Sequence, residues 1–215
     1  MNLSCLKKLT KDEILCGSFG IERETLRVHS MGKLSLTPHP KIFGDKLENP
    51  IVTTDFSESQ TEIISPTFNN IDEAFITFCS LSDMVNEALP ENEYFWFHSL
   101  PCILPEEDEI PIAHYGDDEE GQKSEEYRVK LAKKYGLKKQ MISGIHFNFS
   151  FSDETLKKLF PDDGKQTFEE FKNEIYLKIS RNYIQVTIVL KNLQKTFHHI
   201  LHQEIYLKQK NFIHK

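Results

Sequence analysis

The chain has 215 residues, of which 39% are hydrophobic and 27% are charged, and its formal net charge is −7. This length allows one domain of ordinary size or two small ones, with a core that needs no disulfides for stability. The acidic balance argues against a general nucleic-acid binder, because phosphate neutralisation needs an excess of positive charge. No apolar run approaches the ~20 residues of a membrane span, and the mean hydropathy is −0.46, so we expect no membrane partner.

The cysteines and the first residues point to a reducing compartment. Cys5, Cys16, Cys79 and Cys102 lie far apart without any C-x-x-C pair, so neither a zinc knuckle nor a disulfide framework is indicated. Residues 1–8 lack the apolar run and the small-residue cleavage site of a signal peptide. We therefore expect a cytoplasmic protein.

The first half of the chain predicts a helix followed by short strands. Residues 3–15 are predicted to be helical, and Phe19–Val28 and Gly32–Leu36 are predicted to form a hairpin around a turn at Ser30–Lys33. Two shorter strands are predicted at Ile51–Asp55 and Thr61–Ser65, and Pro66 ends the second of them.

The second half predicts alternating helices and one clear strand. Residues 70–89 form an amphipathic helix before Pro90, and residues 124–135 form a basic helix that ends at Gly136. Met141–Ser152 is the cleanest strand. A last helix opens at Thr167, whose spacing to Glu170 fits a capping box. Because Phe168, Phe171, Ile175 and Ile179 follow a helical period, we expect this helix to be packed as far as Tyr183. Hairpins with helices between them predict an α+β fold with a largely antiparallel sheet.

Three stretches have an unusual composition. Residues 105–126 carry ten acids and one lysine, and residues 127–139 carry six bases and no acid; we interpret them as a solvated loop followed by a solvated helix face. Residues 184–215 contain no Gly, Pro or Asp but hold four of the nine histidines. Because a folded domain of this size normally uses turn residues throughout, this tail is predicted to differ from residues 1–183.

The strand around residues 20–28 carries two glutamates on one face. Residues two apart on a strand point the same way, so Glu22 and Glu24 share a face with Leu26 and Val28. Like charges side by side on a half-buried strand repel each other, and a divalent cation such as magnesium removes that repulsion. The alternative is a solvent-facing edge strand on which Arg23 and Arg27 supply the counter-charge.

Two further segments carry polar groups in β-prone surroundings. Asp55 stands at a strand end, and Glu62 lies within the next strand on the face opposite Ile63; their alternative is a surface loop between edge strands. In the strand 141–152, apolar residues alternate with Gly144, His146, Asn148 and Ser150, which predicts a half-buried strand whose polar face carries one histidine. His146 becomes a candidate metal or phosphate contact if this face meets the acids.

Several familiar catalytic motifs are missing from the sequence. There is no P-loop, no G-x-G-x-x-G turn and no G-x-S-x-G elbow. If a nucleotide binds, metal ions must therefore neutralise most of its phosphate charge.

Taken together, the ordered segments resemble the bacterial glutamate–cysteine ligases. The resemblance covers about residues 17–183 and rests on segments 20–28, 53–58, 62–66, 99–102 and 142–150, supported by residues 113–116, Tyr127-Arg128 and 181–183. It implies a glutamine-synthetase-like ligase fold whose antiparallel sheet forms a concave site for ATP, magnesium, L-glutamate and L-cysteine. It also implies the first step of glutathione synthesis, in which ATP phosphorylates the glutamate γ-carboxylate and the cysteine amine then displaces phosphate.

The resemblance also implies roles for individual residues. By position, the metal and phosphate shell is Glu22, Glu24, Asp55, Glu62 and His146. Part of the cysteine pocket is Phe56, Tyr127 and Gln140, and Arg128 is the cation that faces the acyl phosphate.

Members of this family continue well beyond residue 183, so we expect the tail 184–215 to be a divergent, truncated or frame-shifted end of a ligase domain. Asp55-Phe56-Ser57-Glu58-Ser59-Gln60 also resembles the ligase half of bifunctional glutathione synthetases, and the sequence leaves that choice open. The alternatives are a non-catalytic metal- or ligand-binding remnant and a metal-dependent hydrolase, although the latter lacks an evident base–nucleophile pair.

Overall fold

The structure is a computed structural model that describes residues 9–161 and 163–187. The described residues divide into two compact units, one of Thr10–Ser152 and one that holds Leu9 and the residues from Asp153 onward. Of the helix predicted at residues 3–15, the described part is the single turn α1 (Lys11–Ile14), which Thr10 caps. Residues 1–8 lie outside the described residues.

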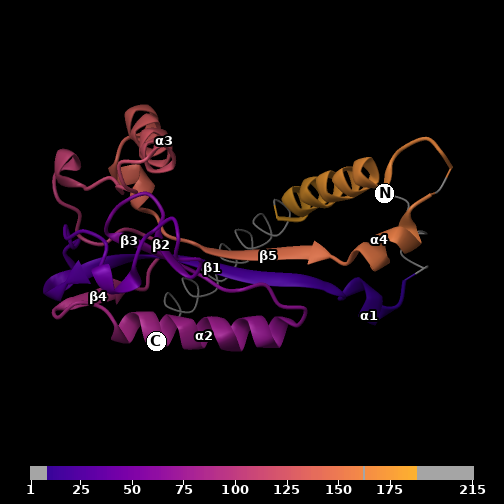
Figure 1. Cartoon of the computed structure of the whole chain (residues 1–215), viewed down its shortest axis with the longest axis horizontal. Helices are drawn as coiled ribbons and strands as arrows, with labels where there is room; N and C mark the ends of the chain where they lie inside the picture. The colour runs from indigo at the N-terminus through magenta and orange to yellow at the C-terminus, as the bar shows by residue number, and fades with distance from the viewer. Residues whose placement is uncertain (1–8, 162, 188–215) are drawn as a thin grey trace, which may run out of the picture. The chain divides into compact units, whose positions relative to one another are not determined.

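The unit Thr10–Ser152 is built on an antiparallel sheet with β1 (Gly17–His29) at its centre (Figure 1). On one side of β1 lie β3 (Gln60–Ile64) and then β2 (Val52–Thr54); on the other side β5 (Ile145–Phe151) and β4 (Glu93–Trp96) pair with successive halves of β1. The predicted α+β class with a largely antiparallel sheet is confirmed. The strands predicted at 51–55 and 61–65 are also confirmed to within one residue, whereas β4 was not predicted.

The hairpin predicted for residues 19–36 forms only in part. The first strand extends to Gly17–His29, but its return is reduced to one bridge between Val28 and Leu34. The chain leaves the sheet there because the fully buried Arg27 guanidinium requires acceptors: its Nη2 donates to the carbonyls of Thr37 (2.7 Å) and Pro38 (3.0 Å). An unpaired buried charge would be far more costly than a short strand.

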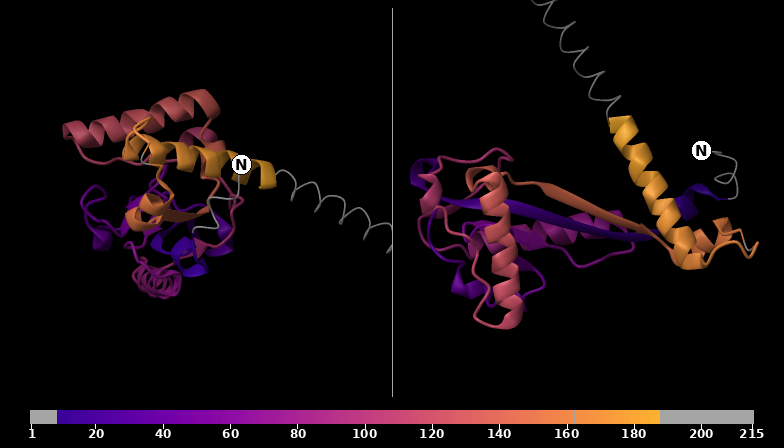
Figure 2. Two further views of the ribbon diagram at one scale, coloured as in Figure 1. Left: turned by 90° about the vertical axis from the view of Figure 1, so that its right-hand side faces the viewer. Right: turned by 90° about the horizontal axis from the view of Figure 1, so that it is seen from above.

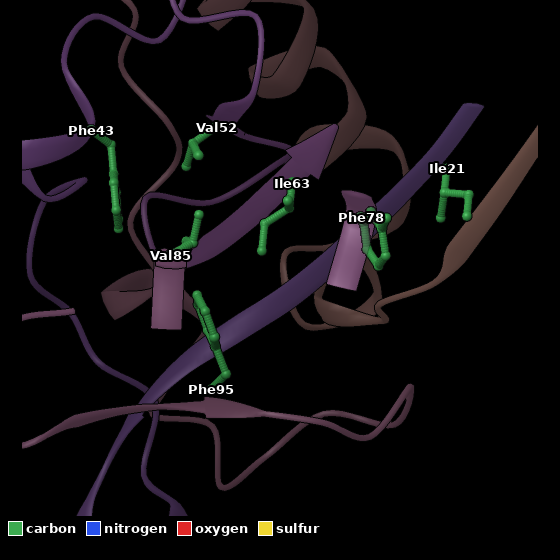
Figure 3. Packing of buried hydrophobic residues seen from close by; sticks show 7 residues of the cluster. All are labelled: Ile21, Phe43, Val52, Ile63, Phe78, Val85 and Phe95. Atoms are coloured by element: carbon green, nitrogen blue, oxygen red, sulfur yellow. The ribbon is translucent and has the colours of Figure 1, made fainter. Parts of the chain in front are cut away.

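Helix α2 (Ile71–Glu87) covers one face of the sheet and confirms the amphipathic helix predicted at 70–89 (Figure 1). Asn70 caps it by accepting hydrogen bonds from the backbone amides of Asp72 and Glu73. Its buried side chains Phe78 and Val85 pack on the sheet residues of one hydrophobic cluster (Figure 3), which is completed by Ile21, Phe43, Val52, Ile63 and Phe95. This cluster anchors β1, β2 and β3 from the side opposite Glu22, Glu24 and Glu62.

Helix α3 (Glu119–Tyr135) lies on the other side of the sheet from α2 (Figures 1 and 2). It begins earlier than the predicted 124–135, because Asp118 caps it by accepting from the Gly121 amide (2.7 Å) and acidic residues favour a helix N-terminus. The acidic stretch 105–126 is therefore only partly a loop. The helix ends at Gly136, as predicted, with φ 87°.

A second hydrophobic cluster lies on the α3 side of the sheet. Leu26 and Val28 of β1 meet Phe56 and Met141 there, and Leu131 and Ala132 of α3 pack against them. Because Leu26 and Val28 alternate in step with Glu22 and Glu24, the acidic residues and this cluster occupy successive parts of the same face of β1.

Strand β5 is shorter and more exposed than predicted. It spans Ile145–Phe151, preceded by a 3₁₀ turn at Lys138–Met141, and pairs with β1 alone. The prediction of a half-buried strand is wrong: Ile145 is 69% exposed and Phe147 52%. These side chains point to the α2 side of the sheet, but the core that α2 builds there is completed by residues of β1–β4 and none of β5.

The unit from Asp153 onward contains α4 (Asp153–Leu159) and a helix over residues 168–187. The predicted capping box is confirmed: the Thr167 amide donates to the Glu170 carboxylate (2.7 Å), and the Glu170 amide donates to the Thr167 hydroxyl (3.2 Å). The prediction that this helix packs as far as Tyr183 is wrong, since Phe171 is buried but Ile179 and Tyr183 are exposed. The tail from residue 188 onward lies outside the described residues.

None of the helices within residues 9–161 and 163–187 is long and apolar enough to span a membrane.

Candidate active site

Strand register brings three predicted acids and the predicted histidine to one face of the sheet. Glu24 of β1 lies directly opposite Glu62 of β3, and Glu22 lies opposite His146 of β5. Directly opposed residues of an antiparallel pair point to the same side with their Cβ atoms ~5 Å apart. Since Glu22 and Glu24 also share a face, all four side chains converge.

His146 joins the two glutamates of β1. Its Nδ1 is 3.6 Å from Glu22 Oε2, and its Nε2 is 3.6 Å from Glu24 Oε1. Two groups hold the carboxylates in place: the amide of Gly144, directly before β5, donates to Glu24 Oε2 (3.1 Å), and Asn148 Nδ2 of β5 donates to Glu22 Oε1 (2.8 Å). A Cβ at position 144 would lie 3.3 Å from His146 Nε2, so a glycine leaves the imidazole the room it needs.

Asp55 and Arg128 extend this group at the turn between β2 and β3. The Asp55 carbonyl accepts a hydrogen bond from Arg128 Nε, and the guanidinium lies 4.2 Å from the centre of the Tyr115 ring. The Tyr115 hydroxyl in turn donates to the carbonyls of Thr54 (2.5 Å) and Asp55 (3.1 Å). Arg128 of α3 is thereby fixed beside an acidic residue from a distant part of the chain.

The electrostatics confirm that these carboxylates act on one another. Burial raises the pKa of Glu62 to about 7, with further contributions from the charges of Asp55, Glu22 and Glu24. Burial followed by the charge of Asp55 raises the pKa of Glu24, and burial raises the pKa of Asp55, which Arg128 and His146 partly offset. Burial is the largest cause of each rise, and repulsion between the carboxylates adds to it for Glu62 and Glu24.

This donor set suits a hard divalent cation. Magnesium prefers carboxylate oxygens, and a cation would relieve both the repulsion and the desolvation that raise these pKa values. Among the described residues, however, no three His, Cys, Asp or Glu side chains already stand together at ligand distances. Glu22, Glu24, Glu62 and His146 would therefore have to draw closer around the ion.

A polar groove runs from the acids along β1 and β5. Its volume is about 340 Å³, and its walls include Glu22 and Asn148 at the acidic end and Ser18, Gly20 and Ser150 beyond them. Gly20 and Asn148 face each other across the strand pair. The groove is thus continuous with the candidate metal site and large enough for part of an extended ligand.

Unlike the acids and His146, the residues predicted for the cysteine pocket do not converge on one place in the structure. Phe56 is only 3% exposed and packs in the second hydrophobic cluster, so its burial does not support a direct contact with a ligand. Tyr127 is 61% exposed on α3, and Gln140 is half-buried in the 3₁₀ turn before β5. Their assignment to a cysteine pocket stays a prediction.

Sequence reasoning missed three residues that shape the site. Asn148 and Gly144 hold the glutamate carboxylates, and Tyr115 anchors both Arg128 and the Asp55 turn. The alternation of small and polar residues around His146 was a signal for the first two. The role of Tyr115 had no local signal, because its hydrogen-bond partners Thr54 and Asp55 lie 60 or more residues away.

Comparisons with known proteins identify the family of this chain. A family model described as glutamate-cysteine ligase matches residues 3–211. The chain belongs to the glutamate–cysteine ligase family. It is 43% identical over 210 residues to the glutathione biosynthesis bifunctional protein of Clostridium perfringens, a match that covers 93% of this chain and 26% of that protein.

Two solved structures support the same family. The bifunctional glutathione synthetase of Pasteurella multocida matches 80% of this chain and 22% of its own, with TM-score 0.71 and 37% identity. The glutamate–cysteine ligase of Francisella tularensis in complex with AMP matches 67% of this chain and 29% of its own, with TM-score 0.64 and 35% identity. The chain thus spans about a quarter of the length of these glutamate–cysteine ligase relatives.

Proposed function

We propose that this chain forms part of a ligase that joins the γ-carboxylate of L-glutamate to the amine of L-cysteine, with ATP as co-substrate and Mg²⁺ as cofactor. The observation that carries the proposal is the convergence of Glu22, Glu24, Glu62 and His146 on one sheet face in a member of this family. Carboxylates in this number are what phosphoryl transfer with magnesium requires.

Residues at different positions of the site would bind the metal and the nucleotide. Glu22, Glu24 and Glu62, with Asp55 and His146, would hold the metal, which neutralises charge on the transferring phosphoryl group. The polar groove beside Glu22 would hold the rest of the nucleotide, a proposal in line with the AMP in the Francisella tularensis relative.

Arg128 would bind and orient the negatively charged acyl phosphate. Its guanidinium is held by the carbonyls of Asp55 and Ser124 (2.9 Å) and by the Tyr115 ring, so its position is fixed before substrate arrives. Preorganised charge of this kind stabilises a transition state without reorganisation during the reaction.

The cytoplasmic location expected from the cysteines stays a prediction.

Magnesium binding tests the metal part of the proposal. Calorimetry at pH 8 on the purified chain should show saturable binding that weakens at least about tenfold in Glu24→Gln, since each ligand contributes directly. Glu119→Gln is the matched control, because Glu119 is an exposed α3 acid that pairs with Lys123. Binding that is absent, or equal in Glu24→Gln and wild type, would contradict the proposal.

Product formation tests the reaction itself. The chain is incubated with ATP, magnesium, glutamate and cysteine, and γ-glutamylcysteine is measured by mass spectrometry. Product that requires ATP and magnesium and is lost in Glu24→Gln supports a ligase. Magnesium binding without any product would favour the alternative of a non-catalytic metal-binding remnant.

A further inference from the structure

Strand β5 (orange in Figure 1) has one edge that no other described strand pairs with. Its other edge pairs with β1, where the Glu24 amide donates to the carbonyl of Gly144 (3.0 Å). In an antiparallel pair every second residue turns its N–H and C=O groups towards the neighbouring strand, so the even-numbered residues of β5 face β1. The N–H and C=O groups of Ile145, Phe147 and Phe149 therefore point away from β1, and they form no hydrogen bond to another backbone segment within residues 9–161 and 163–187.

None of the usual protective features blocks this edge. Soluble proteins commonly guard an exposed edge strand with a lysine, a proline or a β-bulge. The sequence of β5 is Ile-His-Phe-Asn-Phe-Ser-Phe, which contains neither lysine nor proline. Its residues pair one to one with those of β1 from Gly17 to Arg23, so the strand carries no bulge. The edge is therefore open to a further strand, as in complexes that form by strand addition.

The sequence of β5 is complementary to itself in the antiparallel direction. If all seven residues pair with a second copy of the strand, Asn148 lies opposite Asn148 of that copy. In this register Phe147 lies opposite Phe149 of the second copy, and His146 lies opposite its Ser150. Apolar residues thus face apolar ones and polar residues face polar ones, and no acidic or basic residue of β5 creates a like-charge pair.

From this complementarity we propose that β5 is the interface of a symmetric dimer, in which the β5 strands of two copies pair antiparallel about Asn148. A two-fold axis brings the same surface of both copies together. The exposed side chains of Phe147 and Phe149 then form cross-strand aromatic pairs, which stabilise antiparallel sheets.

The dimer also brings a group of the second copy to the candidate active site. His146 lies between Glu22 and Glu24, and Ser150 of the second copy is its directly opposed neighbour in the proposed register. Each copy therefore places a hydroxyl beside the acids of the other. The pairing itself does not depend on the proposed ligase reaction.

Sedimentation equilibrium on the full chain tests for the dimer. We expect a reversible monomer–dimer equilibrium with a dissociation constant of about 10–100 µM, because one strand from each copy makes a small interface. A chain that stays monomeric at ~500 µM would overturn the proposal and would leave the edge to a strand of another protein.

Two lysine substitutions locate the interface. Phe147→Lys replaces one ring in both aromatic pairs and places a charge at the edge, so it should raise the dissociation constant at least about tenfold. Phe75→Lys is the matched control, because Phe75 of α2 lies outside β5 and is similarly exposed, 59% against 52% for Phe147. Equal dissociation constants in the two variants would overturn the proposal.

Hydrogen exchange of the wild type tests the edge without a substitution. The amides of Ile145, Phe147 and Phe149 should exchange at least about threefold more slowly at ~500 µM than at ~5 µM chain, because pairing protects them in the dimer. Protection that is the same at both concentrations would overturn the proposal, since another segment of the same chain would then cover the edge.

Cysteine cross-linking tests the register. Opposed residues of the pair at Asn148 have Cα atoms ~4.5 Å apart, within the range that a disulfide spans. Asn148→Cys should therefore give a disulfide-linked dimer on oxidation with diamide. Ser150→Cys, which faces His146 of the second copy, should give no more than the wild type, whose Cys16 and Cys79 are exposed. Equal yields from the two variants would overturn the proposal.

Discussion

At the scale of single residues, Glu62 couples the candidate site to stability. Its pKa is raised to about 7, so the folded state holds this proton more tightly than the unfolded chain does. The stability that protonated Glu62 contributes is fully present below the ordinary pKa of 4.5 and is lost as the pH rises through about 7.

We therefore expect Glu62→Gln, which cannot ionise, to be more stable than the wild type at pH 8 by about 1–2 kcal/mol after solvent screening is allowed for. The difference should shrink towards zero at pH 5, and magnesium should stabilise the wild type more than the variant at pH 8. Urea unfolding at both pH values measures this. A difference that does not change with pH would contradict the coupling.

Arg27 and Glu93 form the most deeply buried ion pair among the described residues, with side-chain exposures of 0% and 2%. Burial alone would raise the pKa of Glu93, but hydrogen bonds from Ser35 and Thr37, together with the Arg27 charge, hold it below its ordinary value. Glu93→Gln leaves a buried guanidinium without its counter-charge, so we expect a loss of about 3 kcal/mol in unfolding free energy. The exposed pair Lys123–Glu119 is the control, and Glu119→Gln should change stability by less than about 0.5 kcal/mol. Comparable losses of unfolding free energy in Glu93→Gln and Glu119→Gln would contradict the inference that Glu93 is the buried counter-charge of Arg27.

At the scale of elements, β5 combines an apolar pattern with exposure. Ile145 points to the same side of the sheet as the core under α2, but it is 69% exposed, whereas Ile63 of β3 is 1% exposed in that core. An exposed apolar edge strand favours association with other chains.

Ile145→Thr should therefore lower light scattering at high protein concentration while changing the unfolding free energy by less than about 0.5 kcal/mol. Ile63→Thr, the same substitution in the core, should cost about 2–4 kcal/mol. If Ile145→Thr destabilises the chain as much as Ile63→Thr, then β5 is more buried in solution than in this structure.

At the scale of the whole molecule, the chain spans about a quarter of the length of its relatives. Ligation requires the γ-carboxylate and the terminal phosphate to be aligned and the developing charge to be held by fixed groups. Loss of one such electrostatic donor can lower the rate a hundredfold or more. We expect cysteine-dependent phosphate release by the 215-residue chain below about 1 s⁻¹, and ordinary turnover of ~1–10 s⁻¹ would show that the described site suffices.

Much of the fold could be predicted locally. The amphipathic period of α2, the capping box at Thr167 and the strands around Asp55 and Glu62 depend on residues close in sequence, and each forms as predicted. The loss of the hairpin strand after Gly32 could not be predicted, because it depends on the acceptors that the Arg27 guanidinium finds. The exposure of β5 could not be predicted either, because it depends on which distant residues complete the core beneath α2.

The sequence by itself determined the family and the identity of the acids, since these follow from ordered motifs and from the two-residue alternation of a strand. Only the tertiary structure decided which acids meet. Strand register placed Glu24 against Glu62 and Glu22 against His146, and a shift of one residue would have turned these side chains to the opposite face. Register is fixed by burial of Ile21 and Ile63 beneath α2, a contact between distant segments that no local pattern specifies.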